Sequence, residues 1–312
     1  MKVILTGGNG MMARNIQAAW NASGQQFELV SVTRSDADLS DSAATLKLFQ
    51  DIDADAIIHT AARVGGIAAN IAHPTSFLTE NIAVDSSVFS AAKALGIDRL
   101  IYFGSSCMYP RDYRQPLEEK DILAAPLEPT NEGYALSKIV GAKYCSYANS
   151  EYGTNYKVLI PSNLYGPFDD YSLDHGHLVA ATLRKAHEAK LRRQEEILVW
   201  GDGTARREFT YVRDIASWLV KNLHRSEVWP TMMNVGCGVD YTILDFYQTA
   251  LKVVGYECRL AFDSTKPTGM KQKLMDSTIS AKFGWSPQTS LLDGMEIAYR
   301  HFLTQQKAHS FD

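Results

Sequence analysis

The chain opens with a glycine-rich turn between an apolar run and a segment of helical character. Residues 2–6 are typical of a buried β-strand, and Gly7-Gly8-Asn9-Gly10 follows directly. The glycines permit a tight turn and let backbone N–H groups approach a pyrophosphate, and the N-terminus of the following helix adds a positive dipole end. Ala13 keeps that helix close to the strand. These observations predict a dinucleotide-binding site formed by Gly7, Gly8, Asn9, Gly10, Met11 and Met12.

Strand-like and helical patterns alternate as far as residue 160. We expect strands at residues 2–6, 27–33, 56–60, 99–104 and 156–160, and helices at 11–22, 43–50, 74–95 and 134–152. This alternation is typical of right-handed βαβ units. It predicts an α/β fold, a Rossmann-type doubly wound parallel sheet, over residues 1–160.

The rhythm changes after Pro161. We expect a loop at residues 164–171, followed by a helix at 178–189, strands at 197–200 and 207–212, a helix at 214–224 and a strand at 233–235. No linker separates the two halves. The pattern predicts a smaller C-terminal α/β substrate-binding domain over residues 161–312, with parts of about 205–240 returning to the first domain.

Composition excludes several classes of function. The 312 residues carry 31 Lys and Arg against 35 Asp and Glu, a net charge of −4, so there is no broad positive field for nucleic acid or an anionic membrane. No apolar stretch is long enough to span a membrane, and the N-terminal apolar run is too short for a signal peptide. The four cysteines form no Cys-x-x-Cys pair, which favours reduced thiols in a cytoplasmic protein and no bound metal.

A second motif concerns proton transfer. The fourth predicted strand ends in Phe103-Gly104-Ser105, and Tyr134 and Lys138 follow at a spacing that places both on one helix face. An ammonium beside a phenol stabilises the phenolate and lowers the phenol pKa. Tyr134 can then exchange a proton with a carbonyl or hydroxyl oxygen that Ser105 also holds. The sequence predicts Ser105, Tyr134 and Lys138 as catalytic residues of a reductase.

The end of the second predicted strand bears on the choice of cofactor. Arg34 stands first after this strand, which favours the 2′-phosphate of NADP. Asp36 and Asp38 follow closely, and a carboxylate there is typical of NAD sites. The alternative that Arg34 is an ordinary solvated side chain with no role in cofactor binding also stays open.

Taken together, these motifs resemble the extended short-chain dehydrogenase/reductase family and, within it, the GDP-L-fucose synthases. The resemblance covers nearly the whole chain. The segments that carry it are 61–70 (AARVGGIAAN), 104–110 (GSSCMYP), 127–135 (LEPTNEGYA), 161–167 (PSNLYGP), 199–204 (VWGDGT) and 207–209 (REF).

The resemblance implies a bifunctional enzyme that converts GDP-4-keto-6-deoxy-D-mannose to GDP-L-fucose. Such enzymes invert C3 and C5, whose protons the C4 ketone acidifies, and then reduce C4 with NADPH. By resemblance Cys107 is the epimerase base, and His177, rather than the nearby His175, is the acid. The resemblance also implies a homodimer that pairs through the helices near residues 74–95 and 134–152.

Further positions follow from the same resemblance. The cofactor would be bound by Ala61, Ala62, Pro161, Asn163, Leu164 and His177, together with the catalytic Ser105, Tyr134 and Lys138. The GDP-sugar would be bound by Asn163, Lys185, Trp200, Arg207 and Thr268. Five positions depart from the family, in which Arg, Lys, Ala, Arg and Asp are expected in place of Asn9, Arg63, Ser137, Lys185 and Thr268, respectively.

Of these, Lys185 and Thr268 leave room for a changed sugar or a weakened contact with the guanosine. The alternative is therefore a related epimerase/reductase acting on another GDP-4-keto sugar, either a 3,6-dideoxy hexose as in colitose synthesis or a 6-deoxy-heptose. A non-catalytic NADPH-binding sensor is a more remote reading, against which the intact set of catalytic residue types argues.

Overall fold

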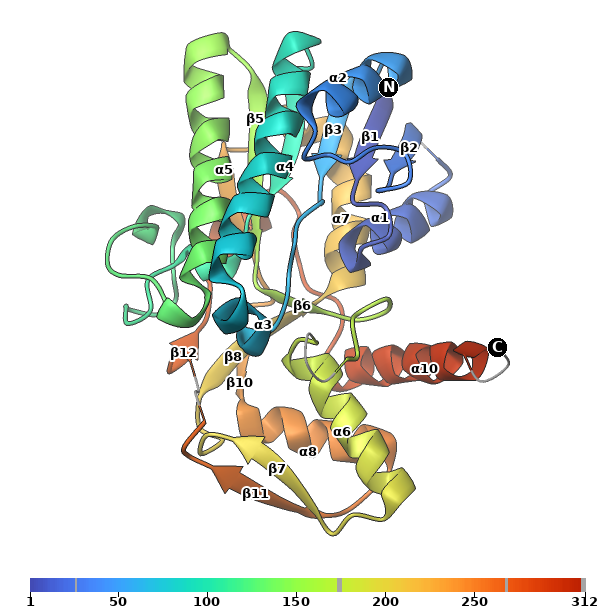
Figure 1. Ribbon diagram of the computed structural model, residues 1–312, viewed down its shortest axis with the longest axis vertical. Helices are drawn as coiled ribbons and strands as arrows, with labels where there is room; N and C mark the ends of the chain where they lie inside the picture. Colours follow the sequence, from blue (N-terminus) through green and yellow to red (C-terminus); the bar gives the residue numbers. More distant parts are fainter. Residues whose placement is uncertain (26, 173–175, 267–268, 310–312) are drawn as a thin grey trace.

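The central sheet of the protein is built from six parallel strands. A computed structural model describes residues 1–25, 27–172, 176–266 and 269–309 (Figure 1). The strand order is β2-β1-β3-β4-β5-β9. The bounds are β1 Lys2–Thr6, β2 Glu28–Val32, β3 Ala56–His59, β4 Arg99–Phe103, β5 Asn155–Pro161 and β9 Met232–Val235. The order changes direction between β1 and β3, and a crevice for a ligand is expected beyond the carboxyl ends of the strands at such a point.

Helices cover both faces of this sheet. One face carries α2 (Ser42–Ile52), α4 (Pro74–Ala94) and α5 (Glu132–Tyr152), and the other carries α1 (Met11–Ala22), α7 (Val212–Asn222) and the short α9 (Thr278–Ala281). The apolar side chains between each helix layer and the sheet form two separate cores, of which Phe49 and Trp218 are members. The Rossmann-type doubly wound sheet is confirmed.

The remaining elements form a smaller α/β layer beyond the carboxyl ends of the central strands (Figure 1). One small sheet joins β6 (Asn163–Tyr165), β8 (Arg206–Tyr211), β10 (Asp240–Thr242) and β12 (Gln272–Lys273), and a second pairs β7 (Glu196–Trp200) with β11 (Arg259–Asp263). Helices α6 (Leu178–Arg192), α8 (Ile243–Val254) and α10 (Leu291–His309) enclose a third core around Leu183 and Phe246.

Local chemistry explains where the main helices begin and end. The Asp41 carboxylate accepts N–H bonds from Ala43 (2.9 Å) and Ala44 (3.1 Å) at the start of α2. Pro74 opens α4, where its missing N–H costs nothing. Gly153 ends α5 in the left-handed region, with φ of 70°.

The structure adds elements that periodicity did not predict. The segment expected to be a loop at 164–171 overlaps the end of β6, which pairs in parallel with β8 from Asn163 to Tyr165. A short helix, α3 (Ile67–Ala72), follows β3, and 3₁₀ turns occupy Ser106–Met108, Glu119–Asp121, Pro129–Asn131 and Leu223–Val228. These elements have three to six residues, too few for a hydrophobic period to show.

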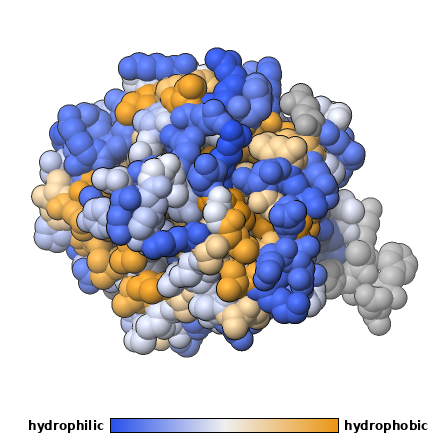
Figure 2. Space-filling model, turned by 90° about the horizontal axis from the view of Figure 1, so that it is seen from above, coloured by the Kyte–Doolittle hydropathy of each residue, from blue (hydrophilic) through white to orange (hydrophobic). Residues whose placement is uncertain are grey.

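The outside of the molecule is mostly polar. Seen from above, hydrophilic residues dominate the surface and hydrophobic ones lie in scattered patches (Figure 2). Within the described ranges, no helix combines the length and apolar character that crossing a membrane requires. Cys107, Cys145, Cys237 and Cys258 are all described, and all are free thiols.

Candidate active site

The glycine turn connects β1 to α1 with a geometry that larger residues do not fit. Gly7 has φ of +71°, and a Cβ there would lie 2.8 Å from the Ala61 Cα. The Gly8 N–H donates to the Val32 carbonyl at 2.8 Å, which ties the turn to β2. Gly10 brings no side chain to the start of α1, so the first N–H groups of the helix face the space above the turn. This cradle fits the pyrophosphate of a dinucleotide.

At the end of β2, the two acidic residues are already engaged by their own turns. Asp36 accepts bonds from the Thr33 N–H and hydroxyl, both at 2.8 Å, and Asp38 accepts from the Ser40 N–H at 3.0 Å. These bonds hold both carboxyl pKa values below their usual range. The Arg34 guanidinium is exposed and has no hydrogen bond or ion pair to the described residues. The arrangement favours a phosphate at this position over a ribose hydroxyl.

Ser105 and Tyr134 meet beyond the carboxyl end of β4. Ser105 follows the strand and starts a 3₁₀ turn, where its hydroxyl accepts the Cys107 N–H at 3.2 Å. The same serine hydrogen-bonds to the Tyr134 phenol. Two of the three predicted catalytic residues are therefore in direct contact.

The expected lowering of the Tyr134 pKa by Lys138 was wrong. Burial of the phenol raises its pKa above the usual value, and the Cys107 sulfur adds to this rise. The Lys138 ammonium instead lies 4.6 Å from the centre of the Tyr102 ring, and Asp85 is the acidic group acting on it. Tyr134 is accordingly a protonated phenol at neutral pH, the form that donates a proton to a ketone oxygen.

The Cys107 sulfur has two polar neighbours that the sequence did not reveal. Asn131 directs its amide nitrogen at the sulfur at 3.2 Å, and the Lys273 ammonium lies at 3.8 Å. Lys273 is buried on the two-residue strand β12, 166 positions along the chain from Cys107. No local sequence pattern marks such a residue. Asn131, by contrast, lies three residues before Tyr134, and the Tyr134 motif could have directed attention to it.

His177 stands at the N-terminal end of α6 and faces the same cluster. Burial lowers the pKa of its imidazole, Asp170 opposes this effect and Lys273 reinforces it. Arg207, on β8, also belongs here: burial lowers the pKa of its guanidinium, while Glu128 and Cys107 raise it. Lys273 thus acts electrostatically on both Cys107 and His177, and Cys107 acts on Arg207.

A second group of predicted residues lies around α6 and β7. The Lys185 ammonium donates to the Leu198 carbonyl and the Tyr247 hydroxyl, both at 3.2 Å, and burial lowers its pKa. Trp200 ends β7 with 42% of its surface exposed, and the Lys266 ammonium lies 5.9 Å from its ring centre. An exposed indole with a lysine ammonium beside it suits a ring and a phosphate group.

The other predicted positions flank these clusters. Ala61 and Ala62 follow β3, Pro161 ends β5, and Asn163 and Leu164 begin β6. Thr268 and the alternative histidine, His175, lie outside the described residues.

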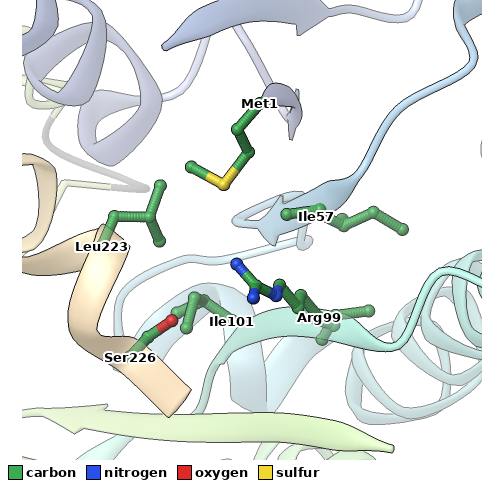
Figure 3. A pocket seen from close by; sticks show the side chains of 8 residues that line it. Met1, Ile57, Arg99, Ile101, Leu223 and Ser226 are labelled. Atoms are coloured by element: carbon green, nitrogen blue, oxygen red, sulfur yellow. The ribbon is translucent and has the colours of Figure 1, made fainter. Parts of the chain in front are cut away.

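A small pocket at the opposite edge of the sheet is unrelated to this site. It is lined by Met1, Ile57, Arg99, Ile101, Leu223 and Ser226 at the amino ends of the strands (Figure 3). Its volume is about 10 Å³, roughly the space that a single water occupies. It cannot hold a nucleotide.

A parallel sheet with a glycine turn after its first strand, and a serine beside a Tyr-x-x-x-Lys helix, define a short-chain dehydrogenase/reductase. More narrowly, the chain belongs to the NAD dependent epimerase/dehydratase family, whose model matches residues 3–236.

Two relatives are similar over their whole length. The GDP-L-fucose synthase of Azorhizobium caulinodans is 40% identical over 308 residues, which are 99% of this chain and 98% of that protein. The GDP-L-colitose synthase of Yersinia pseudotuberculosis is 39% identical over 307 residues, 98% of this chain and 99% of that protein. The crystal structure of a GDP-6-OMe-4-keto-L-xylo-heptose reductase from C. jejuni matches with a TM-score of 0.89 at 27% identity, covering 97% of this chain and 98% of that one.

Proposed function

We propose that this protein is an NADP-dependent epimerase/reductase that converts GDP-4-keto-6-deoxy-D-mannose to GDP-L-fucose. The proposal rests on two neighbouring contacts in the site. Ser105 bonds to the Tyr134 phenol, and two residues further on the Cys107 sulfur meets Lys273. The first pair suits reduction of a ketone, and the second suits removal of a proton beside it. The GDP-L-fucose synthase at 40% identity supports the choice of substrate.

The reductive half of the reaction assigns Ser105 and Tyr134 to the C4 oxygen. Bound NADPH supplies a hydride to the C4 carbon. Ser105 donates a hydrogen bond to the ketone oxygen, and the Tyr134 phenol gives its proton to the oxygen as negative charge develops there. Lys138, four residues after Tyr134 on α5, would supply positive charge to this part of the site. Gly7 to Met12 would hold the pyrophosphate, and Arg34 the 2′-phosphate of the adenosine ribose.

The epimerising half assigns Cys107 and His177 to opposite faces of the sugar. The thiolate of Cys107 removes the proton from C3 or C5, and the C4 ketone carries the resulting charge as an enolate. His177, in its protonated form, gives a proton to the carbon on the other face, which inverts the carbon. The Cys107 thiol then loses its proton to solvent and the His177 imidazole regains one from solvent, so that the second carbon can be inverted in the same way. Lys273 and Asn131 stabilise the sulfur anion by charge and by hydrogen bonding.

The nucleotide part of the substrate is assigned to the second cluster. Arg207 and Lys185 would meet the diphosphate, and the exposed Trp200 indole would pack on a ring of the ligand. Asn163 and Leu164 would line the nicotinamide end of the cofactor site. Thr268 completes the proposed substrate set.

Incubation with GDP-4-keto-6-deoxy-D-mannose and NADPH in D₂O tests both halves. GDP-L-fucose carrying deuterium at C3 and C5 is the expected product. Reduction at C4 without deuterium would remove the epimerase assignment of Cys107 and His177. Binding of NADPH without turnover would reject this substrate.

A second substrate is favoured by a specific comparison. The GDP-L-colitose synthase is 39% identical over nearly the full chain, close to the 40% of the fucose synthase. Lys185 and Thr268 also depart from the pattern of the fucose enzymes. Turnover of a GDP-4-keto-3,6-dideoxy hexose that exceeds turnover of the 6-deoxy sugar would select this alternative.

We also propose a cytoplasmic homodimer that pairs through α4 and α5. Leu136, Val140 and Tyr147 are 37%, 51% and 64% exposed on α5, and free thiols suit a reducing compartment. Val140→Asp should shift the mass in light scattering from dimer to monomer. Val228→Asp, at an equally apolar exposed position away from these helices, should leave it unchanged. A wild-type monomer would reject the dimer.

A further inference from the structure

A buried chain of polar side chains leads from the glycine turn toward Lys138. Thr6, the last residue of β1, places its hydroxyl 2.7 Å from Nδ1 of His59, the last residue of β3. Nε2 of His59 lies 3.0 Å from one oxygen of Asp85 on α4, and the Tyr102 hydroxyl from β4 donates to the other at 2.5 Å. All four side chains are at most 3% exposed. None of them belongs to the site proposed above.

Counting donors and acceptors fixes the direction of this chain. The Thr6 hydroxyl oxygen accepts the N–H groups of Thr60 and Ala61, both at 3.2 Å, which uses its two lone pairs. Its own proton must then go to Nδ1 of His59. The imidazole therefore carries a hydrogen on Nε2 and donates it to Asp85. Asp85 receives two hydrogen bonds and keeps its negative charge.

The charge of Asp85 is matched by Lys138. Burial raises the pKa of the Asp85 carboxyl, but Lys138, His59 and Tyr102 outweigh this and leave the pKa below its usual value. Conversely, burial lowers the pKa of Lys138, and Asp85 opposes that loss. The other titratable groups facing Lys138 are Tyr102 and Cys145. Burial raises the pKa of both, so they are neutral. Asp85 is the one negative charge among these groups.

The packing of α4 against α5 leaves space for this arrangement. Gly141 lies on α5, one turn beyond Lys138, in the interior of a helix where glycine is unfavourable. A Cβ at this position would lie 2.9 Å from an Asp85 oxygen and would also collide with the end of the Tyr102 ring. The two helices lie side by side at this level (Figure 1). The glycine is thus required by the Asp85–Tyr102 contact.

We propose that Asp85 is a positioning residue that keeps the Lys138 ammonium charged and oriented. His59 and Tyr102 hold the Asp85 carboxylate in place for this role. Through Thr6 and His59 the same chain is anchored at the base of the glycine turn. This inference rests on the proposed reductase function, in which Lys138 supports Tyr134.

Asp85→Asn tests the proposal by the pH dependence of ketone reduction. Without the opposing charge, Lys138 loses its proton at lower pH. The alkaline limb of the kcat profile, which is the pH range in which kcat falls, should therefore shift to lower pH by about one to three units. Asp51→Asn makes the same chemical change on α2, where the carboxylate is 62% exposed, and should leave the limb in place. A uniform loss of kcat with an unmoved limb would indicate a structural role only and would overturn the proposal.

Two further measurements keep the proposal testable if the Asp85→Asn variant misfolds or if the wild type shows no turnover. Tyr102→Phe removes one of the two bonds to Asp85 and should produce a smaller shift in the same direction. NMR titration of lysine labelled with ¹³C at Cε, with Lys138→Arg to assign the signal, reads the Lys138 pKa without any substrate. An inactive wild type would reject the proposed function, whereas an unchanged Lys138 pKa in Asp85→Asn would reject the role of Asp85.

Discussion

The Lys273 ammonium lies 3.8 Å from the Cys107 sulfur, although 166 residues separate the two in the chain. Lys273 comes from β12 of the smaller layer and Cys107 from the turn after β4 of the central sheet. The contact therefore joins the cofactor-binding part of the protein to the part that holds Arg207 and His177. It supplies the positive charge that a thiolate base needs.

Lys273→Met should slow epimerisation more than reduction. Losing a charged partner to the sulfur costs about 1.5–3 kcal/mol, or roughly 10–100-fold in the rate of proton removal from the sugar. Deuterium uptake at C3 and C5 measures this step, and reduction of the 3,5-epimerised ketone is the comparison. Lys271→Met changes an exposed lysine two residues away and should have no effect on either rate. Equal loss of both rates would place Lys273 outside the epimerising step.

Tyr134→Phe should abolish reduction while leaving nucleotide binding intact. The raised phenol pKa makes Tyr134 a proton donor at neutral pH, and removing such a donor typically costs about 10²–10⁴-fold. Fluorescence titration with NADPH should give an unchanged Kd. Deuterium exchange at C3 and C5 should persist, since Cys107 and His177 remain. A variant that keeps its reductase activity would show that another group protonates the C4 oxygen.

Arg34→Ser should change the preference between the two nicotinamide cofactors. The guanidinium is exposed at the end of β2, while Asp36 and Asp38 are bonded within their own turns. Losing a charged contact to the 2′-phosphate should raise KM for NADPH by about 10–100-fold. KM for NADH in the same variant is the internal control and should barely move. Parallel increases for both cofactors would point to damage of the turn itself.

Sequence reasoning succeeded where the signal is local. The central strands and their helices were predicted because each carries an uninterrupted apolar run or a helical period, as in β1 and α1. The strands β6, β10 and β12 have two or three residues, and they exist because β8 offers them edges to pair with. The same limit applies to side chains. Tyr134 and Lys138 share one helix, whereas Lys273 meets Cys107 and Asp85 meets His59 only after the chain has folded.

The buried carboxyl of Asp169 predicts how stability depends on pH. One of its oxygens accepts the Asp170 N–H at 2.8 Å, and the other has no hydrogen-bond partner among the described residues. Burial raises the pKa of this carboxyl to about 7, well above the value of 3.8 for an exposed aspartate. Folding therefore favours the protonated form. The associated stability is fully present below pH 3.8 and is lost as the pH rises through about 7.

Asp169→Asn removes this titration while preserving the shape of the side chain. At low pH the variant should match the wild type, and above neutrality it should be more stable, by up to about 4 kcal/mol. Urea unfolding across this pH range measures the difference, and Asp112→Asn, at an aspartate whose side chain is 82% exposed, controls for the loss of a charge. A gap between variant and wild type that stays constant with pH would mean that Asp169 is ionised in the folded protein.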